Sequence, residues 1–260
     1  MNTSSIVGQS PLTASMERIL ASGRIVHAYL FTGPAGSGKK TMSGLFAQAL
    51  LCTDKNNKPC YACKPCRQFI SGNHPDVFWI RRLENKTGIV VDQIRDLQAA
   101  IKVKTYQAGR RICFIDEAHL MTQQAQNAFL KTLEEPPSDT VFFLLAENTN
   151  TLLPTILSRC QIFRIGNLSA EDIIKILRRR LSVSKEDASV IAALSQGNPG
   201  KALALAEDES FQYLRKSLIK GMSLAGSVKI LDLYAIFADY RDRVEDLFNI
   251  LQLWIRDLLI

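Results

Sequence analysis

Short runs of apolar residues alternate with helical patterns through the first two thirds of the chain. The apolar runs lie at residues 27–32, 77–80, 111–115 and 141–146. Between them, apolar residues recur at helical spacing over residues 40–51, 91–102 and 122–133. Strands that are apolar throughout and are separated by helices are typical of a parallel sheet covered on both faces. The pattern therefore predicts a mainly parallel α/β domain.

A different pattern begins after residue 165, where every segment is helical in character. Ser169 and Ser184 each stand three residues before an aspartate, an arrangement that caps the start of a helix. Helices are predicted up to residue 181, up to residue 197, and over 200–206. From residue 209 the pattern stays helical, and the final LQLWIRDLLI has no stop signal. We expect three domains: an α/β domain (1–166), a small helical lid (167–207) and an incomplete helical oligomerisation collar (208–260).

The composition is that of an ordinary globular chain. Of 260 residues, 47% are hydrophobic and 22% are charged, and the net charge is +7. These values exclude collagen-like and wholly disordered chains. The positive charge permits a polyanion partner such as DNA or a nucleotide. No apolar run approaches the ~20 residues of a membrane span, and the start lacks a signal-peptide pattern. We expect a cytoplasmic protein with no membrane partner.

A glycine-rich sequence, GPAGSGK, follows the first apolar run and precedes the first helical segment. This is the context of a P-loop, in which backbone N–H groups and a helix amino terminus hold phosphates and a lysine, here Lys39, reaches the outer ones. The next residue should be Ser or Thr, which binds magnesium; here it is Lys40, and Thr41 comes one place late. ATP or ADP binding is predicted, and magnesium-dependent hydrolysis is left open. The expected nucleotide residues are Gly33, Pro34, Ala35, Gly36, Ser37, Gly38, Lys39, Lys40 and Thr41.

Two carboxylates, Asp116 and Glu117, directly follow the third apolar run. In a nucleotide site, the first carboxylate of such a pair holds magnesium and the second can orient the attacking water. The alternative is a solvated strand end without a catalytic role. The P-loop upstream favours the nucleotide-site interpretation.

Four of the six cysteines fall within fifteen residues: Cys52, Cys60, Cys63 and Cys66. A secreted disulfide scaffold would be shorter and its cysteines more spread out. Four thiolates at this spacing favour a structural, tetrahedral zinc site. An iron–sulfur cluster and free thiols are the alternatives, although the ferredoxin pattern needs a further cysteine that is absent here.

Two further motifs give the chain a resemblance to a known family. Residues 127–137, NAFLKTLEEPP, and residues 155–160, TILSRC, resemble motifs of the bacterial clamp-loader ATPases, members of the AAA+ class. The resemblance starts at Val7 and Gly8 and covers nearly the whole chain. It implies an AAA+ fold with an inserted zinc module, nucleotide contacts from Val7, Gly8 and the polar sensor Asn148, and an arginine finger. That finger is Arg159, acting in a neighbouring subunit's ATP site, where a planar guanidinium suits the developing phosphoryl charge.

The clamp-loader family contains motor subunits, gamma and tau, and a non-motor branch, delta prime. Lys40 favours delta prime, and so does Gly200, which stands where motor subunits carry an arginine for the γ-phosphate. The resemblance then implies a chain with weak or absent ATPase activity. Its implied partners are the gamma/tau and delta subunits, the sliding clamp and primer-template DNA, in a nucleoid-associated replisome. A motor subunit, a purely structural scaffold and a repair helicase of the same superfamily are the alternatives.

Overall fold

The computed structural model describes residues 6–103, 105–106, 109–181, 183–213, 248 and 251–252. These residues belong to two compact units, residues 1–166 and 167–260. The predicted helical collar, residues 208–260, falls largely outside the described residues.

A five-stranded parallel sheet forms the centre of the first unit. Its strands are β1 (Ala28–Thr32), β2 (Val77–Ile80), β3 (Arg111–Ile115), β4 (Thr140–Ala146) and β5 (Gln161–Arg164). They lie in the order β2-β3-β4-β1-β5, and each neighbouring pair is parallel. All residues of β1, β3 and β4 are buried. The carboxyl ends of these three strands therefore meet at one edge of the sheet, where a ligand site is expected in an open α/β sheet.

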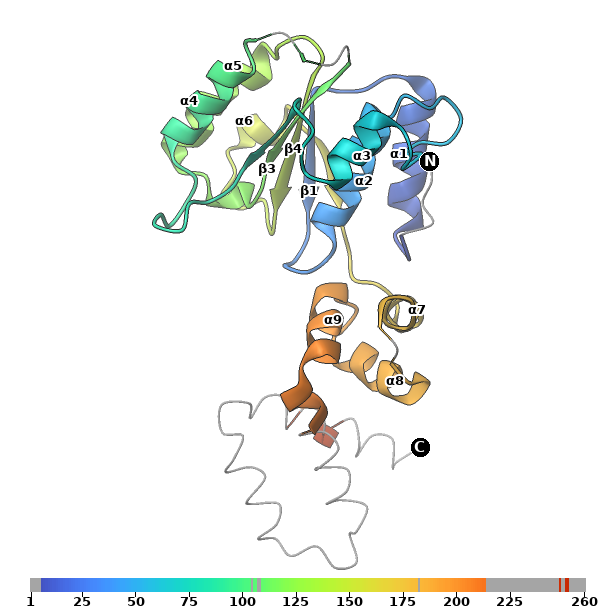
Figure 1. The fold of residues 1–260 in the computed structure, drawn as a ribbon. Helices are drawn as coiled ribbons and strands as arrows, with labels where there is room; N and C mark the ends of the chain where they lie inside the picture. The colour runs from blue at the N-terminus through green and yellow to red at the C-terminus, as the bar shows by residue number, and fades with distance from the viewer. Residues whose placement is uncertain are drawn as a thin grey trace, which may run out of the picture. The chain divides into compact units, whose positions relative to one another are not determined.

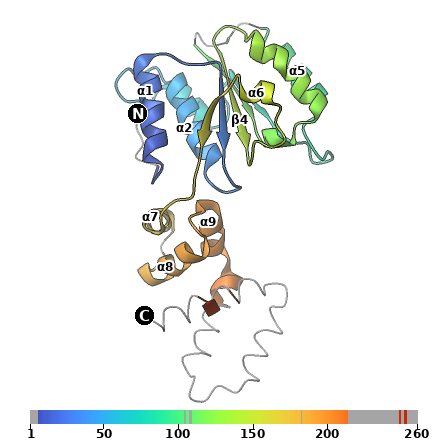
Figure 2. The same cartoon turned by 180° about the vertical axis from the view of Figure 1, so that it is seen from behind.

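Helices cover both faces of this sheet (Figures 1 and 2). One face carries α1 (Ser10–Ser22), α2 (Lys39–Leu51) and α3 (Lys64–Ile70), and the other carries α4 (Val91–Ala100), α5 (Gln123–Glu134) and α6 (Pro154–Leu157). Each layer has its own core. Phe46 of α2 packs against Phe143 with ring centroids 5.9 Å apart, and Phe129 of α5 packs against Phe142 at 5.2 Å. Phe142 and Phe143 are adjacent in β4 and face opposite sides because strand side chains alternate.

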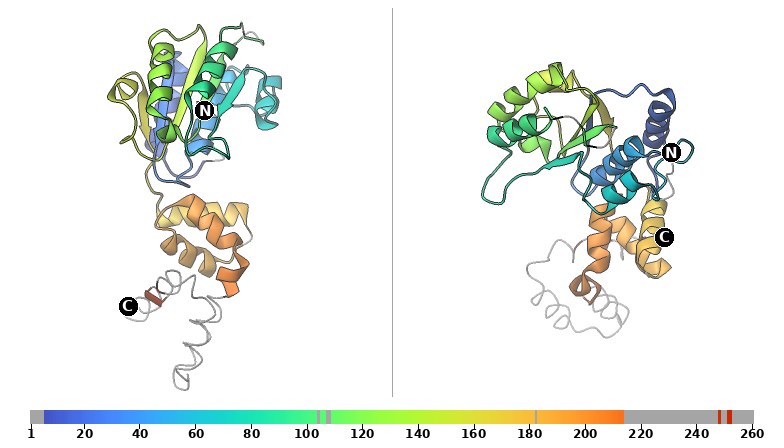
Figure 3. Two further views of the ribbon diagram at one scale, coloured as in Figure 1. Left: turned by 90° about the vertical axis from the view of Figure 1, so that its left-hand side faces the viewer. Right: turned by 45° about the horizontal axis from the view of Figure 1, so that its top comes forward.

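The described part of the second unit includes three packed helices, α7 (Ala170–Arg180), α8 (Lys185–Leu194) and α9 (Pro199–Glu207) (Figure 3, yellow to orange). Each has a polar side chain at its N-cap. Ser169, Ser184 and Asn198 accept hydrogen bonds from backbone N–H groups of the first turns, at 3.0 to 3.1 Å. Ile173, Leu177 and Ile191 lie in their common core.

The predicted fold class is confirmed: a parallel α/β unit precedes a helical one. The predicted strands agree with the observed ones to within one residue at each end. The sequence pattern gives no prediction for α1, α3, α6 or the edge strand β5. The helices α3 and α6 are only 7 and 4 residues long, and β5 is only partly buried, so none has a strong periodic signal. Within the described residues, no helix is long and apolar enough to cross a membrane.

Candidate nucleotide and metal sites

The predicted phosphate loop connects β1 to α2 at the carboxyl edge of the sheet. Gly36 and Gly38 have left-handed backbone conformations, with φ of 74° and 94°, and Gly38 is the N-cap of α2. No described side chain caps this helix, so the N–H groups of its first turn remain available to an anion. A Cβ atom on Gly33 would lie 2.5 Å from the Ile165 carbonyl oxygen. The loop thus depends on glycine both for its turn and for its approach to the strand-end residue Ile165.

Two polar side chains inside the loop indicate what it can bind. Lys39 Nζ donates hydrogen bonds to the carbonyl oxygens of Gly33 (2.7 Å) and Pro34 (2.8 Å). Burial lowers the pKa of Lys39, although Glu147 and Asp116 act in the opposite direction. The buried Ser37 Oγ has no hydrogen-bond partner among the described residues. Such an unsatisfied hydroxyl costs about 1–3 kcal/mol, which a bound phosphate oxygen would offset. The loop residues therefore fit a phosphate group.

The residue at the magnesium position forms an ion pair with the acidic strand end. Lys40 Nζ lies 2.7 Å from Asp116 Oδ2, and Arg81 Nε lies 3.9 Å from the same oxygen. The Asp116 side chain is only 8% exposed, whereas that of Lys40 is 63% exposed. Arg81 also lies over the ring of Trp79, 4.9 Å from its centroid. The carboxylate predicted to hold magnesium is thus occupied by side-chain cations.

Magnesium does not fit this set of residues. Mg–O bonds of ~2.1 Å place two ligands of one ion roughly 3 to 4 Å apart. The 2.7 Å contact between Lys40 and Asp116 leaves no room for an ion between them. An ammonium group also has no lone pair to donate to a metal. We therefore derive no catalytic step from magnesium in this pocket.

The other predicted nucleotide residues lie around the same edge with separate contacts. Glu117 follows β3 in a left-handed conformation, with Oε2 3.9 Å from Arg82 Nε. Asn148 follows β4, and its Oδ1 accepts a hydrogen bond from the Asn150 N–H at 3.1 Å. Thr41 is exposed on the first turn of α2.

The amino-terminal segment, Val7 and Gly8, reaches the same edge through the residue that follows it. Gln9 Nε2 donates to the carbonyl oxygen of Gly166 at 2.6 Å, and Ile165 N donates to that of Thr32 at 2.8 Å. Val7 and Gly8 are therefore close in the fold to the start of the phosphate loop.

Arg159 lies just after α6 and is held by contacts within its own chain. Nη2 lies 2.8 Å from Glu134 Oε1, and Nη1 donates to the Thr155 carbonyl oxygen at 3.0 Å. The Arg159 side chain is 34% exposed. The guanidinium is thus fixed in orientation while part of it remains accessible to another molecule.

The four clustered cysteines come together at the other end of α2. Cys52 ends that helix, Cys60 lies in the following loop, and Cys63 and Cys66 begin α3. Their sulfur atoms all lie within 4.8 Å of one another, with Cys52 and Cys63 at 3.9 Å. Tetrahedral Zn–S bonds of ~2.3 Å separate the sulfurs by roughly 3.8 Å. The cluster can therefore hold a metal ion of this size.

Backbone N–H groups point at the cluster sulfurs. Cys60 N lies 3.4 Å from Cys52 Sγ, and Cys63 N lies 3.3 Å from Cys60 Sγ. Burial alone raises the pKa of Cys63, but hydrogen bonds from Thr53 and Cys66 outweigh it and lower that pKa to about 6. This shift favours the thiolate of Cys63, and the thiolate is the form that binds a metal. Burial raises the pKa of Cys52 and of Cys66 within the cluster, and it raises that of Cys113 and of Cys160 to about 12.

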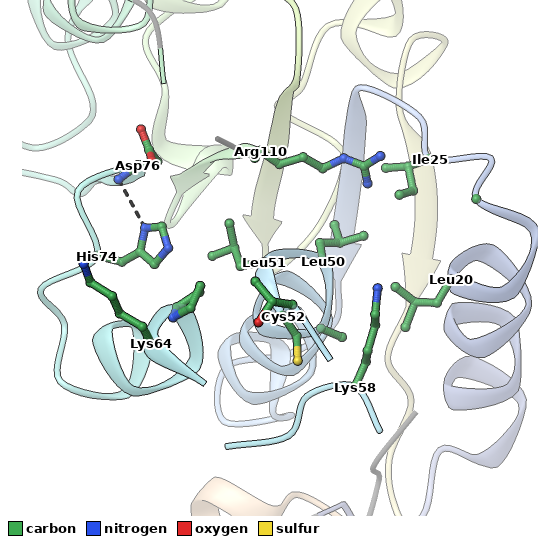
Figure 4. Close-up of a pocket in the computed structure, with 15 residues that line it drawn as sticks. Leu20, Ile25, Leu50, Leu51, Cys52, Lys58, Lys64, His74, Asp76 and Arg110 are labelled. Carbon is green, nitrogen blue, oxygen red and sulfur yellow. Dashed lines mark hydrogen bonds between the residues drawn. The ribbon is translucent and has the colours of Figure 1, made fainter. Parts of the chain in front are cut away.

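A separate cavity of about 720 Å³ lies beside the cysteine cluster, at the amino ends of β2 and β3 (Figure 4). Its lining includes Cys52, Lys58, Lys64, His74, Asp76 and Arg110. His74 Nδ1 accepts a hydrogen bond from the Asp76 N–H at 3.2 Å, and burial lowers the pKa of His74 despite the nearby Asp76. Because α2 connects this region to the phosphate loop, the two sites lie at opposite ends of that helix.

Sequence reasoning missed three charged residues that the fold places at these sites: Arg81, Arg82 and Glu134. Arg81 and Arg82 directly follow β2, which neighbours β3 in the sheet. The rule that carboxyl ends of parallel strands meet at one edge could have located them, had the strand order been known. Glu134 lies within the motif already noted, yet nothing in its spacing indicates Arg159 as a partner.

The comparisons with known proteins agree with this arrangement. The family described as DNA polymerase III, delta subunit, matches residues 8–169. The DNA polymerase III subunit delta prime of Escherichia coli is 32% identical over 231 residues, which cover 87% of this chain and 68% of the relative. The chain belongs to the delta prime family of DNA polymerase III subunits. The delta prime subunit of Pseudomonas aeruginosa is 35% identical, covering 75% of this chain and 60% of the relative.

Tau and gamma subunits of DNA polymerase III are also similar to this delta prime family member. The tau subunit of Bacillus subtilis is 32% identical over 77% of this chain and 36% of its own length. Among the first relatives, the chain spans 36% to 68% of their length. The RuvB Holliday junction branch migration motor of Thermotoga maritima has the same fold, with a TM-score of 0.52 and 16% identity over 89% of this chain and 69% of RuvB. The structural match thus supports the fold described above.

Proposed function

We propose that this chain is a non-motor subunit of the clamp loader that serves DNA polymerase III. In this role it assists the ATP-driven placement of a ring-shaped sliding clamp on primer-template DNA. Its partners are the gamma/tau and delta subunits, and its place is the nucleoid-associated replisome in the cytoplasm. Membership of the delta prime family supports this proposal.

The observation that carries the proposal is the anchored, partly exposed guanidinium of Arg159. Glu134 and the Thr155 carbonyl fix its orientation, so it can be offered to a neighbouring subunit at little entropic cost. We propose that it enters the neighbour's ATP site and stabilises the charge that develops on the transferred phosphoryl group. Arg159 is thereby a catalytic residue in trans.

The chain's own pocket binds a nucleotide without hydrolysing it. Phosphates fit the loop through its backbone N–H groups, Ser37 and Lys39. The carboxylates needed for hydrolysis are both engaged elsewhere: Asp116 by Lys40 and Glu117 by Arg82. This engagement argues against the alternative of an active gamma/tau-type motor.

The cysteine cluster binds one structural zinc ion. Four sulfurs at tetrahedral separations with no open position suit structure rather than catalysis. The metal joins the end of α2 to the start of α3 and replaces a hydrophobic core in this short insertion.

Hydrolysis in a reconstituted loader tests the proposed function. The loader is assembled with the full-length chain, and clamp- and DNA-stimulated ATP hydrolysis at the neighbouring site is measured in single turnover. Arginine fingers contribute roughly 10³- to 10⁵-fold, so Arg159→Ala should slow that site by at least about a hundredfold. Arg178→Ala, which removes an exposed arginine of α7, serves as the matched control.

Three results bear on the alternatives. If Arg159→Ala slows hydrolysis and Lys39→Ala barely changes its rate, the chain is supported as a non-motor subunit. A large loss from Lys39→Ala instead identifies an active motor. If neither variant changes the rate while both assemble, the chain is a scaffold and the proposed role of Arg159 is wrong.

A further inference from the structure

We propose that the ammonium group of Lys40 replaces magnesium in the nucleotide pocket, so that this chain binds nucleoside di- or triphosphates without a divalent ion. The inference rests on the nucleotide pocket of the proposed function but not on the role of Arg159. It assigns Lys40 as the residue that sets the metal requirement of the site.

The position of Lys40 supports this assignment. It is the second residue of α2 and follows the phosphate-binding Lys39, where a P-loop carries the magnesium-binding hydroxyl. Its Nζ lies 2.7 Å from Asp116 Oδ2, on the carboxylate that would share the metal. The ammonium group of Lys40 therefore links α2 to the end of β3, as a bound magnesium ion would.

The carboxylate is held in place for this contact. The Asp116 N–H donates to the Ile80 carbonyl oxygen at 2.9 Å, continuing the pairing of β3 with β2. Its side chain is nearly buried, and Arg81 adds a second positive charge at 3.9 Å. To reach this oxygen, magnesium would have to displace a tethered ammonium group and shed water that it releases reluctantly. The pocket therefore disfavours the metal.

The same ammonium group can meet a phosphate. A lysine has three N–H donors, and the contact with Asp116 uses one of them. The side chain is 63% exposed at the open edge of the loop, so the remaining donors are accessible to a ligand. Lys40 adds one positive charge at the metal position, beside the charge of Lys39 that a P-loop carries in any case.

Nucleotide affinity with and without magnesium tests this inference on the whole chain. ADP and ATP binding is measured by calorimetry in magnesium chloride and in EDTA. Wild type should bind ADP with affinities that agree within about twofold in the two buffers. Lys40→Thr, which restores the usual P-loop residue, should bind about tenfold more weakly in EDTA and recover in magnesium. Lys185→Thr makes the same change at the first residue of α8 and is the matched control.

A direct view of the metal comes from electron paramagnetic resonance of Mn²⁺ with ADP present. Relative to Mn²⁺ with ADP alone, wild type should add no bound-ion signal, and Lys40→Thr should bind one ion. The inference is overturned if the affinity of wild type for nucleotide rises tenfold or more with magnesium, or if wild type binds neither nucleotide. It is also overturned if the nucleotide affinity of Lys40→Thr depends on magnesium as little as that of wild type. If Lys40→Thr does not fold, the nucleotide affinities of wild type in magnesium chloride and in EDTA decide the test by themselves. None of these results depends on hydrolysis at the neighbouring site, so they separate this inference from the role of Arg159.

Discussion

Arg159 and Glu134 form an ion pair, Nη2 to Oε1 at 2.8 Å, that joins the second residue after α6 to the last residue of α5. Both side chains are partly exposed, at 34% and 50%. A pair this exposed adds at most about 1 kcal/mol to stability. Its value therefore lies in orienting the guanidinium rather than in holding the fold together.

Replacing Glu134 with Gln should weaken the finger without unfolding the protein. The guanidinium keeps its hydrogen bond to Thr155 but loses its charged anchor, so hydrolysis at the neighbouring site should fall by about three- to tenfold. This loss should be smaller than that of Arg159→Ala, and the melting temperature should stay nearly constant. Single-turnover hydrolysis and a thermal melt measure the two effects. A rate that rises in Glu134→Gln would mean that Glu134 withholds the finger instead of positioning it.

Purified protein should contain one zinc ion per chain by elemental analysis. Cys66→Ala should remove the metal and lower the melting temperature, because the buried sulfurs then lack the ion that joins α2 to α3. Cys160→Ala, which removes a cysteine outside the cluster, should keep the metal. Iron with visible absorption would indicate an iron–sulfur cluster. Retention of zinc in Cys66→Ala would exclude the four-sulfur site.

The fold was largely predictable because its strands are apolar along their whole length. The runs at β1, β3 and β4 are buried on both faces and so leave an unambiguous pattern. The capping serines of α7 and α8 act within one helical turn, which is a local effect that spacing reveals. The edge strand β5 pairs only with β1 and leaves Gln161 and Arg164 exposed. Its apolar signal is correspondingly short.

The residues of the candidate site were predictable from the sequence, but the contacts between them were not. Lys40 was recognisable as a departure from the P-loop pattern, because the expected residue type follows from magnesium chemistry. Its contact with Asp116 depends on the placement of β3 two strands away from β1, which only the strand order reveals. The cysteine cluster, by contrast, was predictable because its four residues are close in sequence.

Two glycines near the loop should respond in opposite ways to alanine. A Cβ atom at Gly33 would meet the Ile165 backbone oxygen at 2.5 Å, so Gly33→Ala should lower the free energy of unfolding by about 1–3 kcal/mol. Gly44 lies inside α2, and a Cβ there would be 3.9 Å from the Phe69 ring, an ordinary contact. Gly44→Ala should therefore raise stability by about 0.5–1 kcal/mol through helix propensity. Urea titrations of both variants measure the contrast. Equal effects of the two substitutions would contradict the close approach at Gly33.

Lys39 should make the stability of the free protein depend on alkaline pH. Burial lowers its pKa in the folded protein below the value of 10.5 expected for the unfolded chain. Between these two pKa values the unfolded chain binds more protons than the folded one, so stability rises with pH in that interval. At neutral pH the half-buried, charged ammonium group lowers the stability of the free protein. Lys39→Met lacks this titration, so its free energy of unfolding should fall relative to wild type as the pH approaches 10.5.

Urea titrations across that pH interval measure the free energy of unfolding of Lys39→Met and of wild type. Lys185→Met, which removes an exposed lysine, is the control for the loss of one positive charge. ADP should raise the melting temperature of wild type, and Lys39→Met should lose this rise because it has no ammonium group to meet the outer phosphates. The two readouts are independent, since one concerns the free protein and the other the bound state. A constant difference across the interval would show that Lys39 has no lowered pKa. A persistent ADP-induced rise would instead show that the nucleotide is held elsewhere.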